Sequence, residues 1–157
     1  MIDLDIQFND DVWDKEQAEN IAKASAAAVA LSDIQGVRPG DVSILFTSDS
    51  EVQTLNRDWR DKNKPTNVLS FPAPPMPAID GVALPLGDIA IAHGVCVREA
   101  AEKDIPFAHH LSHLIVHGLL HLYGYDHMND DEAGEMEGHE RAILNQMGIP
   151  DPYFVAL

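Results

Sequence analysis

The amino-acid sequence predicts an α/β fold of the α+β-like kind, with one small mixed sheet of about four strands packed with about five helices. Two observations predict this class. Short strand-like segments dominate the first part of the chain, and helices follow and outnumber the strands. In addition, 157 residues with 45% hydrophobic content are enough to enclose one core. We therefore expect residues 1–157 to form a single domain.

The first three elements follow from local patterns. Residues 2–8 alternate apolar and polar side chains, as a half-buried strand does. Residues 15–30 are rich in alanine and predict a helix, which Asp14 can cap through its side chain. Residues 42–46 are mainly β-branched and apolar, so we expect a second strand there.

A short amphipathic helix is expected next. Ser48 or Asp49 can cap its first turn. Val52, Leu55 and Trp59 then recur at helical spacing and define one apolar face. The helix is expected to end near a group of basic residues.

Two further strands enclose a long loop. Residues 67–71 predict a third strand that stops at Pro72, and residues 87–91 predict a fourth. The segment 72–86 between them holds five of the ten prolines, so we expect a loop and not a tight hairpin turn.

Three helices are expected to complete the domain, at residues 94–103, 106–123 and 130–147. The middle helix carries apolar residues that suit burial against other elements. These residues are Leu111, Leu114, Ile115, Leu119 and Leu122.

The same middle helix carries a candidate metal site, which gives the fold a zincin-like metal helix. His117 and His121 are four residues apart and lie on one helical face. Gly124 can adopt the left-handed conformation that ends helices, and can thereby return His127 toward the first two. Three imidazoles and an open fourth position are the ligand set of a catalytic zinc site. We therefore expect one Zn²⁺ ion held by His117, His121 and His127.

Other histidines and the lone thiol receive structural interpretations. His109 and His113 continue the four-residue spacing, but His113 and His121 are about 12 Å apart along a helix axis, too far to share one ion. We expect His109, His110 and His113 to pack, cap or face solvent, and His93 and His139 to be ordinary. Cys96 is the only cysteine and is expected to be a small buried residue.

Charge and targeting signals limit the class of partner. The net charge is −16, which opposes general nucleic-acid binding, but a basic cluster stands near the middle of the chain. This cluster, named here the basic segment, comprises Arg57, Arg60, Lys62 and Lys64. The chain shows no signal peptide and no apolar run that could span a bilayer, so we expect a cytoplasmic protein without a membrane partner.

Five separated blocks together resemble the YbeY family of bacterial rRNA maturation factors and single-strand-directed endoribonucleases. The blocks are Leu55-Asn-Arg-Asp-Trp-Arg60, Pro65-Thr-Asn-Val-Leu-Ser-Phe-Pro72, Leu86-Gly-Asp-Ile89, Arg98-Glu-Ala100 and His113 through His127. They cover most of residues 40–145 in the family's order. Asn67 departs from the pattern, since many relatives have aspartate there, and we assign it no acid or base role.

The resemblance implies an activity, partners and site residues. It implies zinc at His117, His121 and His127 and a functional role for Arg60. It further implies action in 16S rRNA 3′-end maturation and ribosome quality control in the cytoplasm, on rRNA of the ribosome or its small subunit, with a ribosomal or GTPase protein as possible partner and no DNA.

The residues suit phosphodiester cleavage. Zinc lowers the pKa of a bound water and thereby supplies a nucleophile. Arg60 offers a planar fork of donors, so we expect it to clamp the scissile phosphate, although pairing with Asp58 or Asp61 is the alternative. Asp126 can orient an imidazole or accept a proton, and Asp88 is expected to stabilise a turn.

Two other functions remain open at the level of sequence. A non-catalytic ribosome-associated factor with a structural metal is one. The other is a metalloprotease-like hydrolase, because the spacing H-x3-H-x2-G-x2-H is that of metzincins. Position 118, however, holds glycine where those proteases have their glutamate base.

Overall fold

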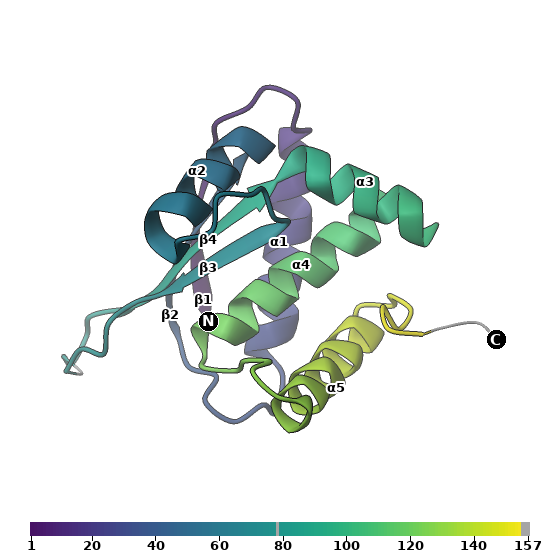
Figure 1. Cartoon of the computed structure of the whole chain (residues 1–157). Helices are drawn as coiled ribbons and strands as arrows, with labels where there is room; N and C mark the ends of the chain where they lie inside the picture. The colour runs from purple at the N-terminus through teal and green to yellow at the C-terminus, as the bar shows by residue number, and fades with distance from the viewer. Residues whose placement is uncertain (78, 155–157) are drawn as a thin grey trace.

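The computed structural model describes residues 1–77 and 79–154, and these contain one four-stranded mixed sheet and five helices, as predicted (Figure 1). Element bounds agree with the sequence prediction to within a few residues. In chain order the elements are β1 (Ile2–Phe8), α1 (Lys15–Ala30), β2 (Gly40–Thr47), α2 (Asp49–Arg60), β3 (Val68–Pro72), β4 (Pro85–Ala92), α3 (His93–Lys103), α4 (Phe107–Leu122) and α5 (Asp130–Gln146).

The strand order is β1-β2-β4-β3, which leaves β1 and β3 at the two edges. β1, β2 and β4 are parallel, whereas β3 runs antiparallel to β4 with Val68 opposite Ile91. β2 and β4 extend beyond the predicted segments because pairing in the middle of the sheet recruits Gly40, Asp41 and Pro85. Because β3 is an edge strand, one of its sides has no partner strand in the described part of the chain. Arg60 contacts β3 through the Ser70 carbonyl.

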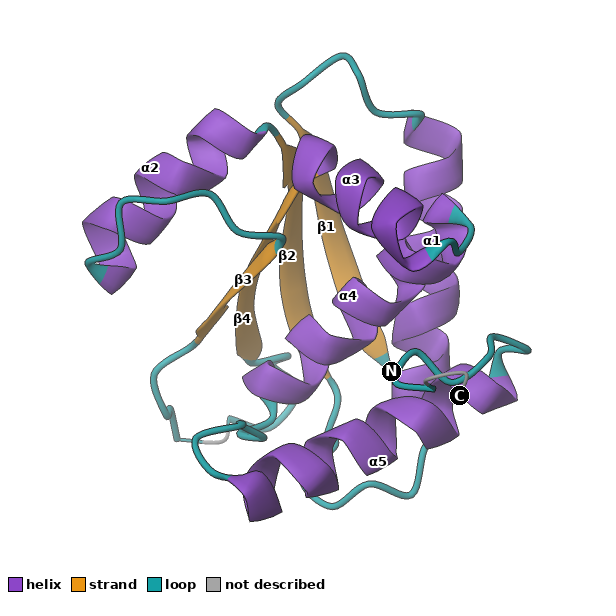
Figure 2. Ribbon diagram, turned by 45° about the vertical axis from the view of Figure 1, so that its right-hand side comes forward, coloured by secondary structure: helices purple, strands orange, loops and turns teal. Residues whose placement is uncertain are grey.

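α4 is the central helix of the molecule. It packs against β3, β4, α1, α3 and α5, and most of its residues are buried. Its apolar side chains point toward several neighbouring elements, and its histidines recur every four residues along one face. In Figure 2, α1, α3, α4 and α5 lie on one side of the sheet and α2 lies on the other. The C-terminal half of α4, which carries His117 and His121, lies beside the edge strand β3.

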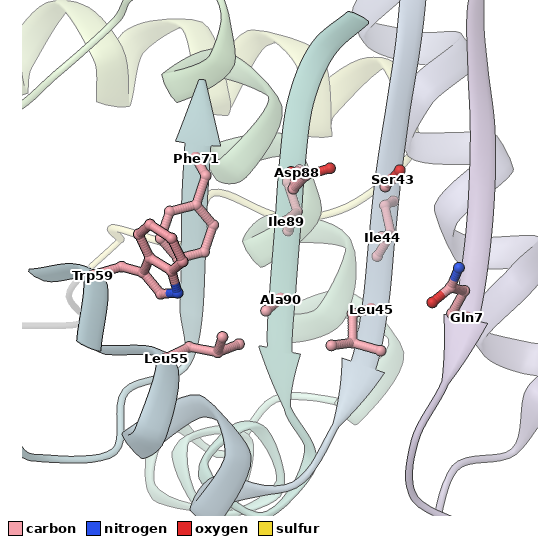
Figure 3. Close-up of a pocket in the computed structure, with 10 residues that line it drawn as sticks. All are labelled: Gln7, Ser43, Ile44, Leu45, Leu55, Trp59, Phe71, Asp88, Ile89 and Ala90. Atoms are coloured by element: carbon pink, nitrogen blue, oxygen red, sulfur yellow. The ribbon is translucent and has the colours of Figure 1, made fainter. Parts of the chain in front are cut away.

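The second face of the sheet is only partly covered. Val52 of α2 packs with Leu69, Ala90 and Ala92 in a small separate cluster. Beside it, Leu55, Trp59 and Phe71 border an open groove of about 500 Å³, which Figure 3 shows from outside. This groove, named here the outer groove, lies on the sheet face opposite α4 and its histidines.

The helix caps join the elements. The Asp14 side chain accepts a hydrogen bond from the Gln17 amide and caps α1, as predicted. Ser48, and not Asp49, caps α2. The carboxylate of Asp49 instead accepts from the Val95 amide and from Arg98, so it ties the start of α2 to α3.

None of the helices in residues 1–77 and 79–154 combines the length and apolar character that a bilayer crossing needs.

Candidate metal centre

The C-terminal end of α4 brings three imidazoles together. Gly124 has φ +96°, and its amide donates to the His121 carbonyl while the Tyr125 amide donates to the Leu120 carbonyl. This pair of bonds is a Schellman motif, which reverses the chain direction after a helix. The reversal carries His127 back toward the last turn of α4.

The distances between the rings suit one shared ion. One ligand nitrogen from each of His117, His121 and His127 lies within 4.8 Å of the others. The Nε2 atoms of His117 and His121 are 3.1 Å apart, close to the ~3.3 Å that separates two nitrogens bound tetrahedrally to zinc at ~2.0 Å. His117 and His121 are half-buried and His127 is exposed, so the point between them is open to solvent.

The protonation state of the site also fits a metal. Burial holds the pKa of His121 below its ordinary value, and the neighbouring His117 and His127 lower it further. His121 is therefore neutral near pH 7, and the neutral imidazole is the form that binds metal ions. Imidazole nitrogen is also a ligand atom that Zn²⁺ commonly binds in proteins.

A buried carboxylate lies behind the rings. Oε1 of Glu140, on α5, accepts hydrogen bonds from His117 Nδ1 at 2.7 Å and from His113 Nε2 at 2.9 Å. Burial alone would raise the pKa of Glu140, but these hydrogen bonds outweigh it and lower the pKa from 4.5 to about 2. Glu140 is thus an ionised group directly behind His117.

Arg60 lines the same cleft as the three histidines. This cleft has a volume of about 710 Å³, and Lys62, Lys64 and Asp126 also border it. The Arg60 Nη2 donates to the Ser70 carbonyl, and its guanidinium lies 5.4 Å from the centroid of the Phe71 ring. Among residues 1–77 and 79–154, no carboxylate forms a salt bridge with Arg60, because Asp58 pairs with Arg57 instead.

Gly118 packs closely against the sheet, so a larger residue there would require its neighbours to shift. Gly118 is buried against the sheet, and a Cβ there would lie 3.1 Å from both Ile89 Cδ1 and Ser70 Oγ. The Gly118 carbonyl also accepts from Ser70 Oγ at 3.2 Å. The metalloprotease mechanism therefore lacks its glutamate base, and a glutamate placed here would press on Ile89 and Ser70 of the sheet.

The remaining polar candidates have structural partners. Asp126 is exposed, and its Oδ1 accepts from the His127 amide at 2.8 Å, which supports the turn. Buried His110 contacts Glu99 at 2.8 Å, and Asn67 donates to the same carboxylate oxygen. Asp88 lies inside β4, paired with β2 and β3, and is exposed at the border of the outer groove, so the prediction that it stabilises a turn was wrong.

The other sequence expectations concern packing. Cys96 is fully buried, as predicted, and burial raises the pKa of its thiol to about 12. His93 stacks edge-on against Trp13, and His139 against Tyr125. Sequence reasoning missed Glu140 and its partner Tyr153. No local sequence pattern marks Glu140, because its contact with His117 depends on how α5 packs against α4.

The mixed sheet, its central helix and three imidazoles beside an arginine-lined cleft define an α/β protein with a candidate metal centre of three histidines, the ligand number of catalytic zinc sites. The model of the family described as Endoribonuclease YbeY matches residues 5–148. The chain belongs to this family.

Individual relatives agree with this assignment. Proteins named Endoribonuclease YbeY are 47% identical in Azorhizobium caulinodans, covering 97% of this chain and 96% of the relative. In Rhodopseudomonas palustris the identity is 52%, covering 91% and 87%. The solution structure of a Thermotoga maritima protein superposes with a TM-score of 0.54 at 23% identity, covering 99% of this chain and 100% of the other. That likeness supports the fold.

Proposed function

We propose that this protein is a zinc-dependent, single-strand-directed endoribonuclease that acts in 16S rRNA 3′-end maturation and ribosome quality control. The observation that carries the proposal is the shared cleft, which places Arg60 and the three histidines around one space. Membership in the endoribonuclease YbeY family supports RNA as the substrate.

His117, His121 and His127 would hold the zinc ion. When bound, zinc would supply positive charge to stabilise the phosphate and would lower the pKa of a water molecule. The residues themselves provide position: Arg60 presents a charged, planar donor group to the phosphate from the β3 side of the cleft. Its hydrogen bond to the Ser70 carbonyl and its contact with Phe71 hold the guanidinium at the cleft border.

Asp126 has a supporting role in this proposal. It lines the cleft, and its hydrogen bond to the His127 amide orients the turn that carries the third ligand. As the alternative role in this proposal, the Asp126 carboxylate accepts a proton from the attacking water.

The biological setting follows from the same assignment. We propose that residues 1–157 work as one domain in the cytoplasm, on rRNA of the ribosome or its small subunit. The net charge of −16 makes tight binding to arbitrary RNA unfavourable, so a ribosomal or GTPase protein partner would supply targeting.

A cleavage assay tests the proposal. Zinc-loaded protein is incubated with single-stranded RNA and with casein, with and without a zinc chelator, beside a His121→Ala variant purified in the same way. We expect RNA cleavage that is lost in the chelator and in the variant, and no casein cleavage. RNA cleavage that persists unchanged in the variant would contradict the proposal. Inactivity of the metal-loaded protein on both substrates would support a non-catalytic ribosome-associated factor instead.

A further inference from the structure

Glu140 determines which nitrogen of His117 carries hydrogen. An ionised carboxylate only accepts hydrogen bonds, so the Nδ1 of His117, 2.7 Å from Glu140 Oε1, must be the protonated nitrogen. The Nε2 of the same ring is then left with a free lone pair. This atom is the one that faces His121 Nε2 at 3.1 Å, on the side of the candidate metal centre.

Two further donors fix the carboxylate itself. His113 Nε2 shares Oε1 with His117, at 2.9 Å, and the Tyr153 hydroxyl donates to Oε2 at 2.8 Å. Glu140 has no exposed surface, so these three bonds replace the water it would have in the unfolded chain. The carboxylate therefore has little freedom to leave His117.

Tyr153 makes the last described turn of the chain part of this arrangement. Asp151 accepts from the Tyr153 amide at 2.8 Å and pairs with Arg141 of α5 at 3.1 Å. Arg141 also lies over the Tyr153 ring, 5.3 Å from its centroid. The turn at residues 151–154 is thereby held against the helix that carries Glu140.

A second metal ion is the other interpretation of this cluster, since ligand atoms of His113, His117 and Glu140 also lie within 4.8 Å of one another. The contacts between them, at 2.7 Å and 2.9 Å, are instead hydrogen-bond distances. An ion there would have to displace the hydrogens that neutral imidazoles place between nitrogen and carboxylate. The cluster fits a hydrogen-bonded support better than a binding site.

We propose that Glu140 is a positioning residue for the metal centre, which holds His117 in the Nδ1–H form with Nε2 directed at the ion, and that His113 and Tyr153 hold Glu140 in place. The inference rests on the proposed function only in requiring zinc at His117, His121 and His127. Carboxylates that bind the outer nitrogen of a ligating histidine commonly strengthen metal binding by about 10–100-fold.

Zinc affinity and tautomer state are measured on the full chain in five forms: wild type, Glu140→Gln, Tyr153→Phe, His121→Ala and Glu102→Gln. Glu102→Gln makes the same chemical change on the exposed face of α3 and serves as the control. Competition with a chromophoric chelator gives the zinc dissociation constant. Long-range ¹H–¹⁵N spectra of the labelled proteins show which ring nitrogen of His117 carries hydrogen. Circular dichroism of the metal-free forms checks folding.

We expect Glu140→Gln to weaken zinc binding by about 10–100-fold and to populate both His117 tautomers in the metal-free protein. Tyr153→Phe, which removes only a hydroxyl, should weaken binding by about fivefold. Should Glu140→Gln fail to fold, the Tyr153→Phe result decides. Unchanged affinity and tautomer in the folded variants would overturn the inference, even where His121→Ala abolishes binding and RNA cleavage supports the proposed function. Wild-type protein that binds no zinc would overturn both.

Discussion

Arg60 approaches the backbone of β3 instead of a neighbouring carboxylate. Its guanidinium donates to the Ser70 carbonyl and lies over the Phe71 ring, while Arg57 pairs with Asp58. The remaining donors of a guanidinium extend in a fixed plane, which a lysine ammonium cannot reproduce. At the scale of single residues, this geometry separates Arg60 from the other cations of the basic segment.

Arg60→Lys should therefore slow RNA cleavage by about 10–100-fold, the equivalent of losing a charged hydrogen bond of about 1.5–3 kcal/mol. Zinc content should not change, because Arg60 contributes no ligand. Single-turnover cleavage of a labelled single-stranded RNA measures the effect. Arg57→Lys, in the exposed pair with Asp58, is the matched control and should cleave like wild type. Equal rates for Arg60→Lys and wild type would remove the clamp.

Gly118→Glu recreates the sequence H-E-x-x-H and tests the steric argument against a protease. The new side chain would press on Ile89 and Ser70, since its Cβ alone would lie 3.1 Å from an atom of each, and it would bring a carboxylate into a buried position. We expect the free energy of unfolding in urea to fall by about 3–5 kcal/mol, with no casein cleavage. Gly138→Glu on α5 has nothing within 4 Å and should change stability by less than about 1 kcal/mol. A stable, proteolytic Gly118→Glu protein would contradict this account.

At the scale of elements, the C-terminal end of α4 brings the regularly spaced histidines together in the candidate metal centre. The four-residue interval and Gly124 were enough to predict that three histidines meet, because helix geometry and positive φ are local properties. Glu140 could not be predicted, since its approach to His117 depends on how α5 packs against α4. The contact of Arg60 with β3 likewise depends on where α2 ends relative to the sheet edge. Local elements are visible in the sequence, and contacts between elements are not.

Gly124→Ala should destabilise the protein by about 1 kcal/mol, because φ +96° is unfavourable for alanine. It should also weaken zinc binding, because relief of this strain moves the turn that carries His127. Gly81→Ala, at φ +79° with equally open surroundings, controls for the conformational cost alone. Urea unfolding and zinc competition measure the two effects. The prediction is wrong if both variants have the same zinc affinity.

The contact between His110 of α4 and Glu99 of α3 makes the stability of the protein depend on pH. Burial holds the pKa of His110 below its ordinary 6.5, although its hydrogen bond to Glu99 partly opposes this. Below pH 6.5 the unfolded chain therefore binds a proton that the folded chain does not. The free energy of unfolding consequently decreases as the pH is lowered. Metal-free wild type should lose more unfolding free energy than His110→Gln between about pH 7.5 and pH 5.5. His109→Gln is the matched control, and equal losses in wild type and His110→Gln would contradict the prediction.

At the scale of the whole molecule, the protein has a net charge of −16 but a basic border along one side of the cleft. This border consists of Arg60, Lys62 and Lys64. The border is anchored: the buried Asn56 side chain donates to the Lys64 carbonyl at 3.0 Å, and the Lys62 amide donates to the Asn56 carbonyl. The backbone of Lys62 and Lys64 is thus held in place, and both residues border the cleft with Arg60 and the histidines. RNA should be attracted to this border and repelled from most of the remaining surface.

RNA affinity should consequently be weak and steeply dependent on salt. Three phosphate contacts, from Arg60, Lys62 and Lys64, predict a slope of about −2 for log affinity against log salt with single-stranded RNA. Fluorescence anisotropy with metal-free protein, which leaves the RNA intact, measures this slope. Lys64→Gln should reduce it by about 0.7, because one counterion fewer is released. Lys103→Gln at the far end of α3 should leave it unchanged. A slope that responds equally to both lysines would mean that RNA binds through diffuse charge and not along the anchored border.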